Sequence, residues 1–143
     1  MRIFIAGATG TLGRPVVRLL RSRGHEVVGL TRSPERARAL DKLGVHAVVG
    51  DALDRDAVSA LVAAARPDRV LHLLTALPPG GPTRKRHLTS TNELRIRGTA
   101  NLIHAAMEAG AARLVAESFV GVYGRVSSKH PTIREGLKRA SVA

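Results

Sequence analysis

Three glycines, each three residues after the last, stand between an apolar run and an amphipathic run near the start of the chain. They are Gly7, Gly10 and Gly13, in the segment Gly-Ala-Thr-Gly-Thr-Leu-Gly. Gly7 permits a tight turn, Gly10 lets a ligand approach the backbone, and Gly13 lets a helix pack against the preceding strand. The N–H groups of Thr11 and Leu12, at the positive end of that helix, then face the ligand. The pattern predicts a turn that binds the diphosphate of a dinucleotide, and the alternative is a glycine-rich turn without a ligand.

The end of the second apolar run indicates which dinucleotide fits. A site for NAD usually has an acidic side chain about 20 residues after the glycines, where it holds the ribose 2′-hydroxyl. Here the segment 29–33 reads Gly-Leu-Thr-Arg-Ser and contains no carboxylate. A guanidinium binds a phosphate through two parallel hydrogen bonds, so Arg32 favours NADP(H) over NAD(H). The alternative is that Arg32 is one solvated surface residue among the 19 arginines of this chain.

One carboxylate follows the third apolar run. Asp51 stands between Gly50 and Ala52, where it could accept a hydrogen bond from the amino group of an adenine ring. On spacing alone, Asp51 fits equally well as a turn or helix-start carboxylate, so both interpretations stay open.

These residues can act together only if the segments around them fold in the right order. Strand and helix alternate along the chain, which predicts an α/β fold with a doubly wound parallel sheet (the Rossmann fold) and strand order 3-2-1-4-5. The ligand is then expected at the carboxyl ends of strands one and four. Five apolar runs predict the strands: Arg2–Ala6, Glu26–Leu30, Val45–Val49, Arg69–Leu74 and Arg113–Ala116.

The helices between these strands are predicted from periodicity and capping residues. Apolar residues at positions 12, 16, 19 and 20 define one face of a first helix. Ser33 before Pro34, and Asp54, predict the starts of two more helices. A single long helix is expected from Ser90 to Ala109, with these residues on its inner side: Leu94, Leu102, Ile103 and Ala106.

Composition limits the possible classes of function. The 143 residues suit one domain, and the net charge of +12 favours anionic partners. The absence of cysteine excludes a disulfide framework, a Cys-ligated zinc site and thiol catalysis. The six histidines show no metal spacing, so no metal site is predicted. No apolar run approaches the roughly 20 residues of a membrane span, and the N-terminus does not resemble a signal peptide, so we expect a cytoplasmic protein without a membrane partner.

Taken together, the motifs resemble the short-chain dehydrogenase/reductase superfamily, in its extended and atypical branch, the NAD(P)-dependent epimerase/dehydratase group. The resemblance covers residues 1–124 and predicts an NAD(P)-binding Rossmann domain there, followed by a poorly ordered basic tail at 125–143. The matching segments are the glycine turn, Thr31-Arg32-Ser33-Pro34, Gly50-Asp51, Val70-Leu71-His72-Leu73-Leu74, Gly98-Thr99-Ala100-Asn101-Leu102, Leu114-Val115-Ala116-Glu117-Ser118 and Val122-Tyr123-Gly124.

The resemblance also implies roles for individual residues. Arg32 would meet the 2′-phosphate, while Asp51 and Ala52 would border the adenine. Ser118 falls near the family's active-site serine, which hydrogen-bonds the substrate oxygen. Further residues would line the nicotinamide ribose, namely Leu74, Thr75 and Ala76, and the diphosphate, namely Gly7, Thr9, Gly10, Thr11, Leu12 and Gly13.

The sequence departs from the family in its catalytic residues. The family uses a Tyr with a Lys four residues later to pass a proton as hydride moves to or from the nicotinamide. The only tyrosine here, Tyr123, has Ser127 at that place, and Ser118 is five residues before Tyr123 where the family has four. Family members run to about twice this length, so we expect a fold truncated after the fifth strand and a cofactor domain whose catalytic activity is doubtful.

Two other functions stay open on the sequence. The first is a non-catalytic NADP(H) sensor or regulatory protein. The second is a basic nucleic-acid-associated protein on a Rossmann scaffold, although no motif supports specific nucleic-acid binding. A basic cluster at 84–87, with Arg95 and Arg97, is interpreted as a contact for phosphates or as a solvated face. The edge beyond the fifth strand, if left bare, predicts self-association.

Overall fold

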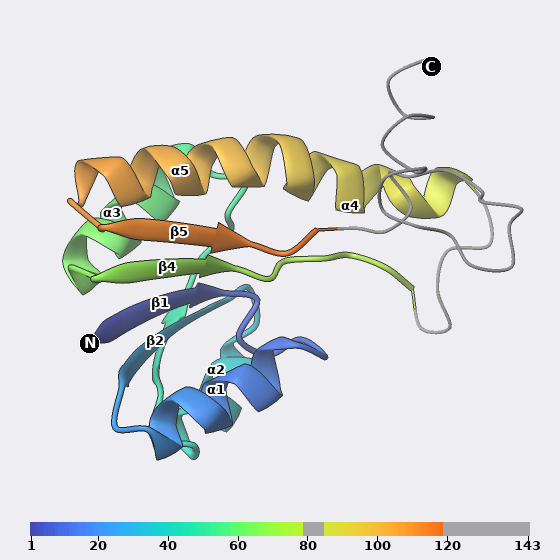
Figure 1. The fold of residues 1–143 in the computed structure, drawn as a ribbon. Helices are drawn as coiled ribbons and strands as arrows, with labels where there is room; N and C mark the ends of the chain where they lie inside the picture. Colours follow the sequence, from blue (N-terminus) through green and yellow to red (C-terminus); the bar gives the residue numbers. More distant parts are fainter. Residues whose placement is uncertain (79–84, 119–143) are drawn as a thin grey trace, which may run out of the picture.

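The computed structural model describes residues 1–78 and 85–118 (Figure 1). All neighbouring strands in it run parallel, in the order β3-β2-β1-β4-β5. This arrangement confirms the predicted doubly wound α/β sheet. The strands are β1 (Arg2–Ala6), β2 (Glu26–Thr31), β3 (His46–Val49), β4 (Arg69–His72) and β5 (Arg113–Ala116).

Helices connect these strands and cover both faces of the sheet (Figure 1). As predicted, the Ser33 hydroxyl caps α2 by accepting from the Arg36 N–H at 3.2 Å, and Asp54 caps α3 by accepting from the Ala57 N–H at 3.1 Å. No helix in residues 1–78 or 85–118 is long and apolar enough to cross a membrane. The helices are α1 (Gly13–Ser22), α2 (Pro34–Asp41), α3 (Arg55–Ala65), the 3-10 helix η1 (Lys85–Leu88), α4 (Thr89–Glu93), the π-helix η2 (Leu94–Gly98) and α5 (Thr99–Glu108).

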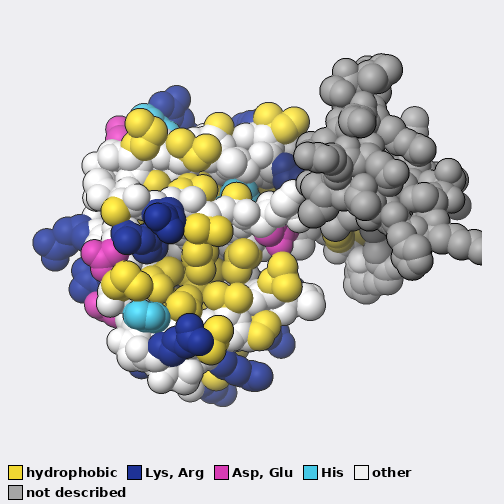
Figure 2. Space-filling view, viewed as in Figure 1, with side chains coloured by type: hydrophobic (Ala, Val, Ile, Leu, Met, Phe, Trp, Pro, Cys, Tyr) yellow, Lys and Arg dark blue, Asp and Glu magenta, His cyan; other side chains and the backbone are white. Residues whose placement is uncertain are grey.

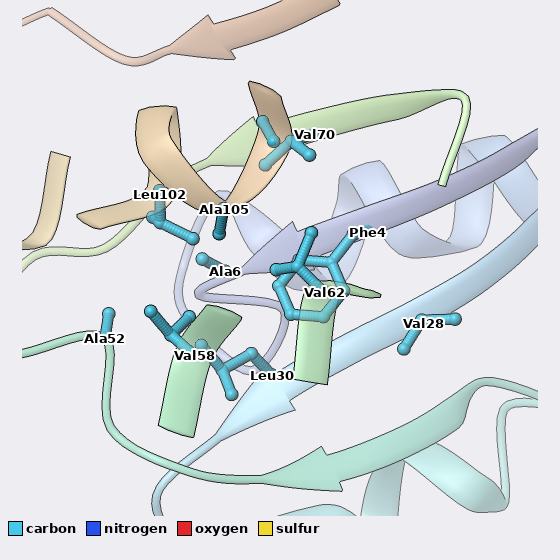
Figure 3. Close-up of a cluster of buried hydrophobic side chains, with 11 residues drawn as sticks. Phe4, Ala6, Val28, Leu30, Ala52, Val58, Val62, Val70, Leu102 and Ala105 are labelled. Atoms are coloured by element: carbon cyan, nitrogen blue, oxygen red, sulfur yellow. The ribbon is translucent and has the colours of Figure 1, made fainter. Parts of the chain in front are cut away.

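The core consists of two aliphatic layers, one on each side of the sheet. On the side of α3 and α5, Phe4 of β1 packs in one cluster with Val62 of α3 and Leu102 of α5 (Figure 3). On the side of α1 and α2, Ile5 packs in a second cluster with Val17. Because both faces of β1 are buried, the end of this strand is a rigid base for the glycine turn that follows it.

The structure corrects three details of the predicted elements. The fourth strand ends at His72 instead of Leu74, because the Leu74 N–H donates to the His72 imidazole rather than to a neighbouring strand. The inner face of α1 centres on Gly13 and Val17, so Leu12 and Leu19 are exposed. The predicted long helix contains the π-helix η2. The last part of the predicted helix, α5, buries Leu102, Ala105 and Ala106, and Ile103 lies beside this face and is exposed.

Candidate dinucleotide site

One pocket of about 980 Å³ runs along the carboxyl ends of the strands. Most of the residues expected from the sequence line it, including Arg32, Asp51 and Ser118. Two do not. Gly13 is buried beneath the turn, and the Ala76 N–H is directed to the Thr91 hydroxyl at 2.8 Å. The other expected residues that line the pocket are Gly7, Thr9, Gly10, Thr11, Leu12, Ala52, Leu74 and Thr75.

The three glycines have different structural reasons to lack a side chain. Gly7 has a φ of +95°, and a Cβ there would lie 2.5 Å from the Leu73 carbonyl oxygen. A Cβ on Gly13 would collide with the Gly7 carbonyl oxygen, so Gly13 serves the packing of α1 against the turn, as predicted. A Cβ on Gly10 would lie 3.3 Å from the Gly7 oxygen, with no other described atom within 4 Å. Of these three Cβ positions, only the one on Gly10 faces open space at the pocket.

Backbone N–H groups stand at this opening. The N–H groups of Thr11 and Leu12 donate no hydrogen bond to any residue in the described segments. The N-cap position of α1, Leu12, brings no side-chain oxygen, and the first turn holds no acidic residue. Because the first turn of a helix carries a partial positive charge, an anion bound here would satisfy these donors. The turn therefore fits the diphosphate of a dinucleotide in shape and in charge.

Past β2, the pocket is lined by two guanidinium groups. Arg32 is exposed, and its Nη1 lies 4.0 Å from Oδ2 of Asp51. Arg36, in the first turn of α2, also lines the pocket. The other carboxylate oxygen of Asp51 accepts from the Leu53 N–H at 3.0 Å. Asp51 thus has the turn role that the sequence left open, and it also lies at the wall where an adenine was expected.

The chain leaving β4 forms the next part of the wall, and His72 fixes its path. This side chain is 3% exposed. Its Nδ1 accepts from the Leu74 N–H at 3.2 Å, and its Nε2 lies 2.9 Å from the Thr99 hydroxyl. Because Nδ1 is an acceptor, the proton of the neutral ring is assigned to Nε2. The imidazole is therefore a satisfied core group, and it holds Leu74 at the pocket wall.

Burial lowers the pKa of His72 below the usual value of 6.5. A hydrogen bond with the Leu94 backbone opposes this shift, and the nearby positive charge of Arg95 adds to it. A lowered pKa means that the unfolded chain takes up a proton at a higher pH than the folded chain does. We therefore expect the free energy of unfolding to have its maximal His72 contribution above about pH 6.5 and to decrease as the pH falls towards the lower pKa of the folded state. Urea titrations between pH 5 and 8 measure this loss.

The matched variant for this prediction is His72→Asn, which keeps an oxygen acceptor for the Leu74 N–H but cannot be protonated. The two proteins differ only at position 72, so the difference in their pH dependence isolates His72. The wild type should lose stability over this range and the variant should lose less. The same pH dependence in both proteins would contradict the assignment.

Past β4 and β5, a half-buried ion pair lies beside Ser118. Nη2 of Arg95, from η2, is 3.6 Å from Oε1 of Glu117. Ser118 itself is exposed, and Tyr123 lies outside the described residues. Arg97, predicted in one basic cluster with Arg95, instead pairs with Glu93 on the same helical stretch. No group of three or more His, Asp or Glu in the described segments could hold a metal ion.

Sequence reasoning missed several residues of this pocket. Arg36 carried one detectable signal, since it follows the Ser33 cap and therefore begins a helix near Arg32. Arg95 was singled out only as part of a basic cluster, and Glu117 carried no signal, because their meeting depends on the π-helix and on the register of β5. The other missed residues are Leu30, Thr31, Ser33, Gly50, Leu73, Leu77, Pro78 and Leu94.

Comparison with known proteins agrees with this geometry. The model of the NAD dependent epimerase/dehydratase family matches residues 3–141. A 3-diazoavenalumate denitrifying reductase of a Streptomyces species is 49% identical over 118 residues, which cover 82% of this chain and 38% of the reductase. A 2-alkyl-3-oxoalkanoate reductase of Stenotrophomonas maltophilia is 35% identical over 139 residues, which cover 96% of this chain and 38% of that enzyme.

A solved structure extends the comparison. A short-chain dehydrogenase/reductase superfamily protein from Agrobacterium tumefaciens, with bound NAD, matches with a TM-score of 0.70 and 27% identity. The match covers 96% of this chain and 41% of that protein. This chain thus spans about two fifths of the length of these relatives, and the resemblance read from the motifs is confirmed.

Proposed function

The chain belongs to the NAD dependent epimerase/dehydratase family, and on this premise we propose that residues 1–124 form the cofactor domain of an oxidoreductase that binds NADP(H). The observation that carries the proposal is the opening at Gly10, where the N–H groups of Thr11 and Leu12 meet the pocket without a partner among the described residues. The names of the two curated relatives describe reductases, which supports reduction over epimerisation as the reaction type.

Within this proposal, each part of the pocket wall binds a different part of the cofactor. The bound cofactor would supply a hydride or accept one. The glycine turn would hold its diphosphate, and Arg32 with Arg36 would take the 2′-phosphate at the adenosine end. Asp51 and Ala52 would border the adenine, and the Asn101 amide supports this wall by donating to the Ala52 carbonyl at 2.9 Å. The chain leaving β4 would then place the nicotinamide ribose towards Ser118.

The preference for NADP(H) rests on the charges past β2. The described wall offers Arg32 and Arg36 to a 2′-phosphate, and the nearest carboxylate in the pocket, Asp51, is 4.0 Å from Arg32. The bound NAD of the Agrobacterium relative supports a dinucleotide as such, and the guanidinium groups of this chain are the argument for the additional phosphate.

Titration of the full chain with NADPH and NADH, followed by nucleotide fluorescence, tests the proposal. We expect saturable binding of both, with NADPH bound at least about tenfold more tightly, because a charge-assisted hydrogen bond to phosphate contributes about 1.5–3 kcal/mol. No saturable binding of either nucleotide would overturn the function. Equal affinities would overturn only the preference for NADP(H).

A non-catalytic NADP(H) sensor, the alternative that the sequence left open, is the second candidate. The two candidates predict the same binding isotherm. They differ in turnover, since a sensor binds NADPH and oxidises none of it in the presence of carbonyl compounds.

We further propose that the edge of β5 mediates self-association. Within the described residues, β5 pairs with β4 only, and Val115 on this strand is 48% exposed. Figure 2 shows hydrophobic side chains gathered in the middle of the visible face, between β5 and α1 and therefore on the β4 side of β5. The proposal rests on the strand edge itself, because a strand edge without a partner invites pairing with a second copy.

Sedimentation velocity over a wide concentration range measures this association. The wild type should shift towards dimers or larger species as concentration rises, and Val115→Lys should weaken the shift, because a charge on an edge strand opposes pairing. A wild-type protein that stays monomeric at high concentration would contradict the proposal.

A further inference from the structure

Among the described residues, two carboxylates line the pocket, and they differ in the hydrogen bonds that they accept. Asp51 accepts from the Leu53 N–H at 3.0 Å with one oxygen, and its other oxygen lies 4.0 Å from Arg32. The Glu117 side chain is 16% exposed, and its oxygens accept no hydrogen bond from the described part of the chain. A partly buried carboxylate in this state is costly, because its oxygens have lost part of their hydration. Glu117 is therefore the carboxylate of the pocket that has capacity for donors from a ligand.

The backbone of Glu117 is held in place independently of its side chain. Glu117 directly follows β5, and its N–H donates to the His72 carbonyl at 3.0 Å, which extends the pairing of β5 with β4 by one residue. Because His72 is buried, this hydrogen bond ties Glu117 to the core of the sheet. The carboxylate thus lines the pocket from a rigid element, as precise binding of a ligand requires.

The surroundings of the Glu117 carboxylate favour a neutral hydrogen-bond donor. The positive charge of Arg95 lies 3.6 Å from Oε1 of Glu117 and balances the negative charge of the carboxylate. A cationic ligand would be attracted by Glu117 but repelled by Arg95, and an anionic ligand would meet the reverse. A neutral hydroxyl group avoids both repulsions and still donates to a carboxylate oxygen. Leu73, Leu77 and Leu94 give this end of the pocket an apolar wall, which suits the carbon framework of a ligand.

We propose that Glu117 accepts a hydrogen bond from a hydroxyl group of the substrate, whose carbon framework packs against the apolar wall. The substrates of this site are neutral carbonyl compounds that carry a hydroxyl group on an apolar framework. This inference rests on the proposed function, in which the cofactor occupies the rest of the pocket and Ser118 meets the reacting oxygen. Because consecutive Cα atoms are about 3.8 Å apart, the hydroxyl group would lie within a few bonds of the reacting carbonyl.

Three ketones that differ in one substituent test this assignment, namely 4-hydroxycyclohexanone, 4-methylcyclohexanone and protonated 4-aminocyclohexanone. NMR titrations measure the affinity of the full chain for each ketone, with and without saturating NADP+, which cannot reduce them. The wild type should bind the hydroxy ketone about tenfold more tightly than the methyl ketone, because a hydrogen bond to a charged acceptor is among the stronger ones. The amino ketone should bind no more tightly than the hydroxy ketone.

Two variants of Glu117 separate the hydrogen bond from the shape of the pocket. The preference for the hydroxy ketone should disappear in Glu117→Leu and persist in part in Glu117→Gln, whose amide oxygen is still an acceptor. The affinity for the methyl ketone should stay within about twofold in both variants, which reports that the pocket is intact. The matched control is Glu93→Gln, since Glu93 also pairs with an arginine of η2, Arg97, but does not line the pocket. This control should keep the wild-type preference.

Several results would overturn the inference. They are equal wild-type affinities for the hydroxy and methyl ketones, no detectable binding of any ketone, tightest binding of the amino ketone, and a hydroxyl preference that survives Glu117→Leu. The failure of the proposed function looks different. If NADP+ does not bind while the preference that depends on Glu117 is measured without it, the proposed function fails and the hydroxyl site stands.

Discussion

Replacing Gly10 with valine is expected to abolish NADPH binding while leaving the fold intact. A Cβ at this position would lie 3.3 Å from the Gly7 carbonyl oxygen and otherwise meets open space, so the turn has to yield by only a few tenths of an ångström. The two γ-methyl groups of valine would then stand in front of the Thr11 and Leu12 N–H groups. Loss of two charge-assisted hydrogen bonds, at about 1.5–3 kcal/mol each, predicts a decrease in affinity of about a hundredfold or more.

Two matched variants make this result specific. Gly10→Ala adds only the Cβ and should retain most of the binding. Gly13→Val should instead fail to fold, because the side chain would collide with the Gly7 carbonyl oxygen beneath α1. Fluorescence titration gives the affinities, and thermal unfolding reports the fold. Binding by Gly10→Val with wild-type affinity would remove the glycine turn from the site.

Replacing Arg32 and Arg36, the two arginines beyond the end of β2, with glutamate is expected to invert the preference for NADPH over NADH. In the double variant Arg32→Glu, Arg36→Glu, two guanidinium contacts to the 2′-phosphate are lost, and two carboxylates repel it. The expected loss for NADPH is about 3 kcal/mol or more, which is more than a hundredfold. NADH has no 2′-phosphate, so its affinity should change much less.

The control for this variant is Arg38→Glu, which changes the same charge on the same helix, α2, but does not line the pocket. This variant should keep the wild-type ratio of NADPH to NADH affinity, apart from a small long-range electrostatic effect that added salt screens. A double variant that also keeps the wild-type ratio would show that the arginines past β2 do not select the cofactor.

The elements around the glycine turn could be predicted from the sequence because their signals are local. The strand β1, the turn and the start of α1 follow one another within the first 22 residues. The caps at Ser33 and Asp54 depend on a side chain and a backbone N–H three residues away. Strand order could be predicted too, because few topologies satisfy right-handed crossovers.

The remaining features depend on contacts between distant segments. Arg95 and Glu117 meet only because η2 and the end of β5 border the same pocket, and no spacing in the sequence encodes that meeting. The apolar spacing of α5 allows Ile103 inside, but its packing with α3 selects Leu102, Ala105 and Ala106 as the buried face. The role of His72 in holding Leu74 likewise requires Thr99, which is 27 residues away.

A crystal structure of the chain with NADPH tests the central claim most directly. We predict diphosphate oxygens within about 2.7–3.2 Å of the Thr11 and Leu12 nitrogens, at the opening beside Gly10. A dinucleotide bound elsewhere on the molecule, with these two N–H groups facing only water, would contradict the account.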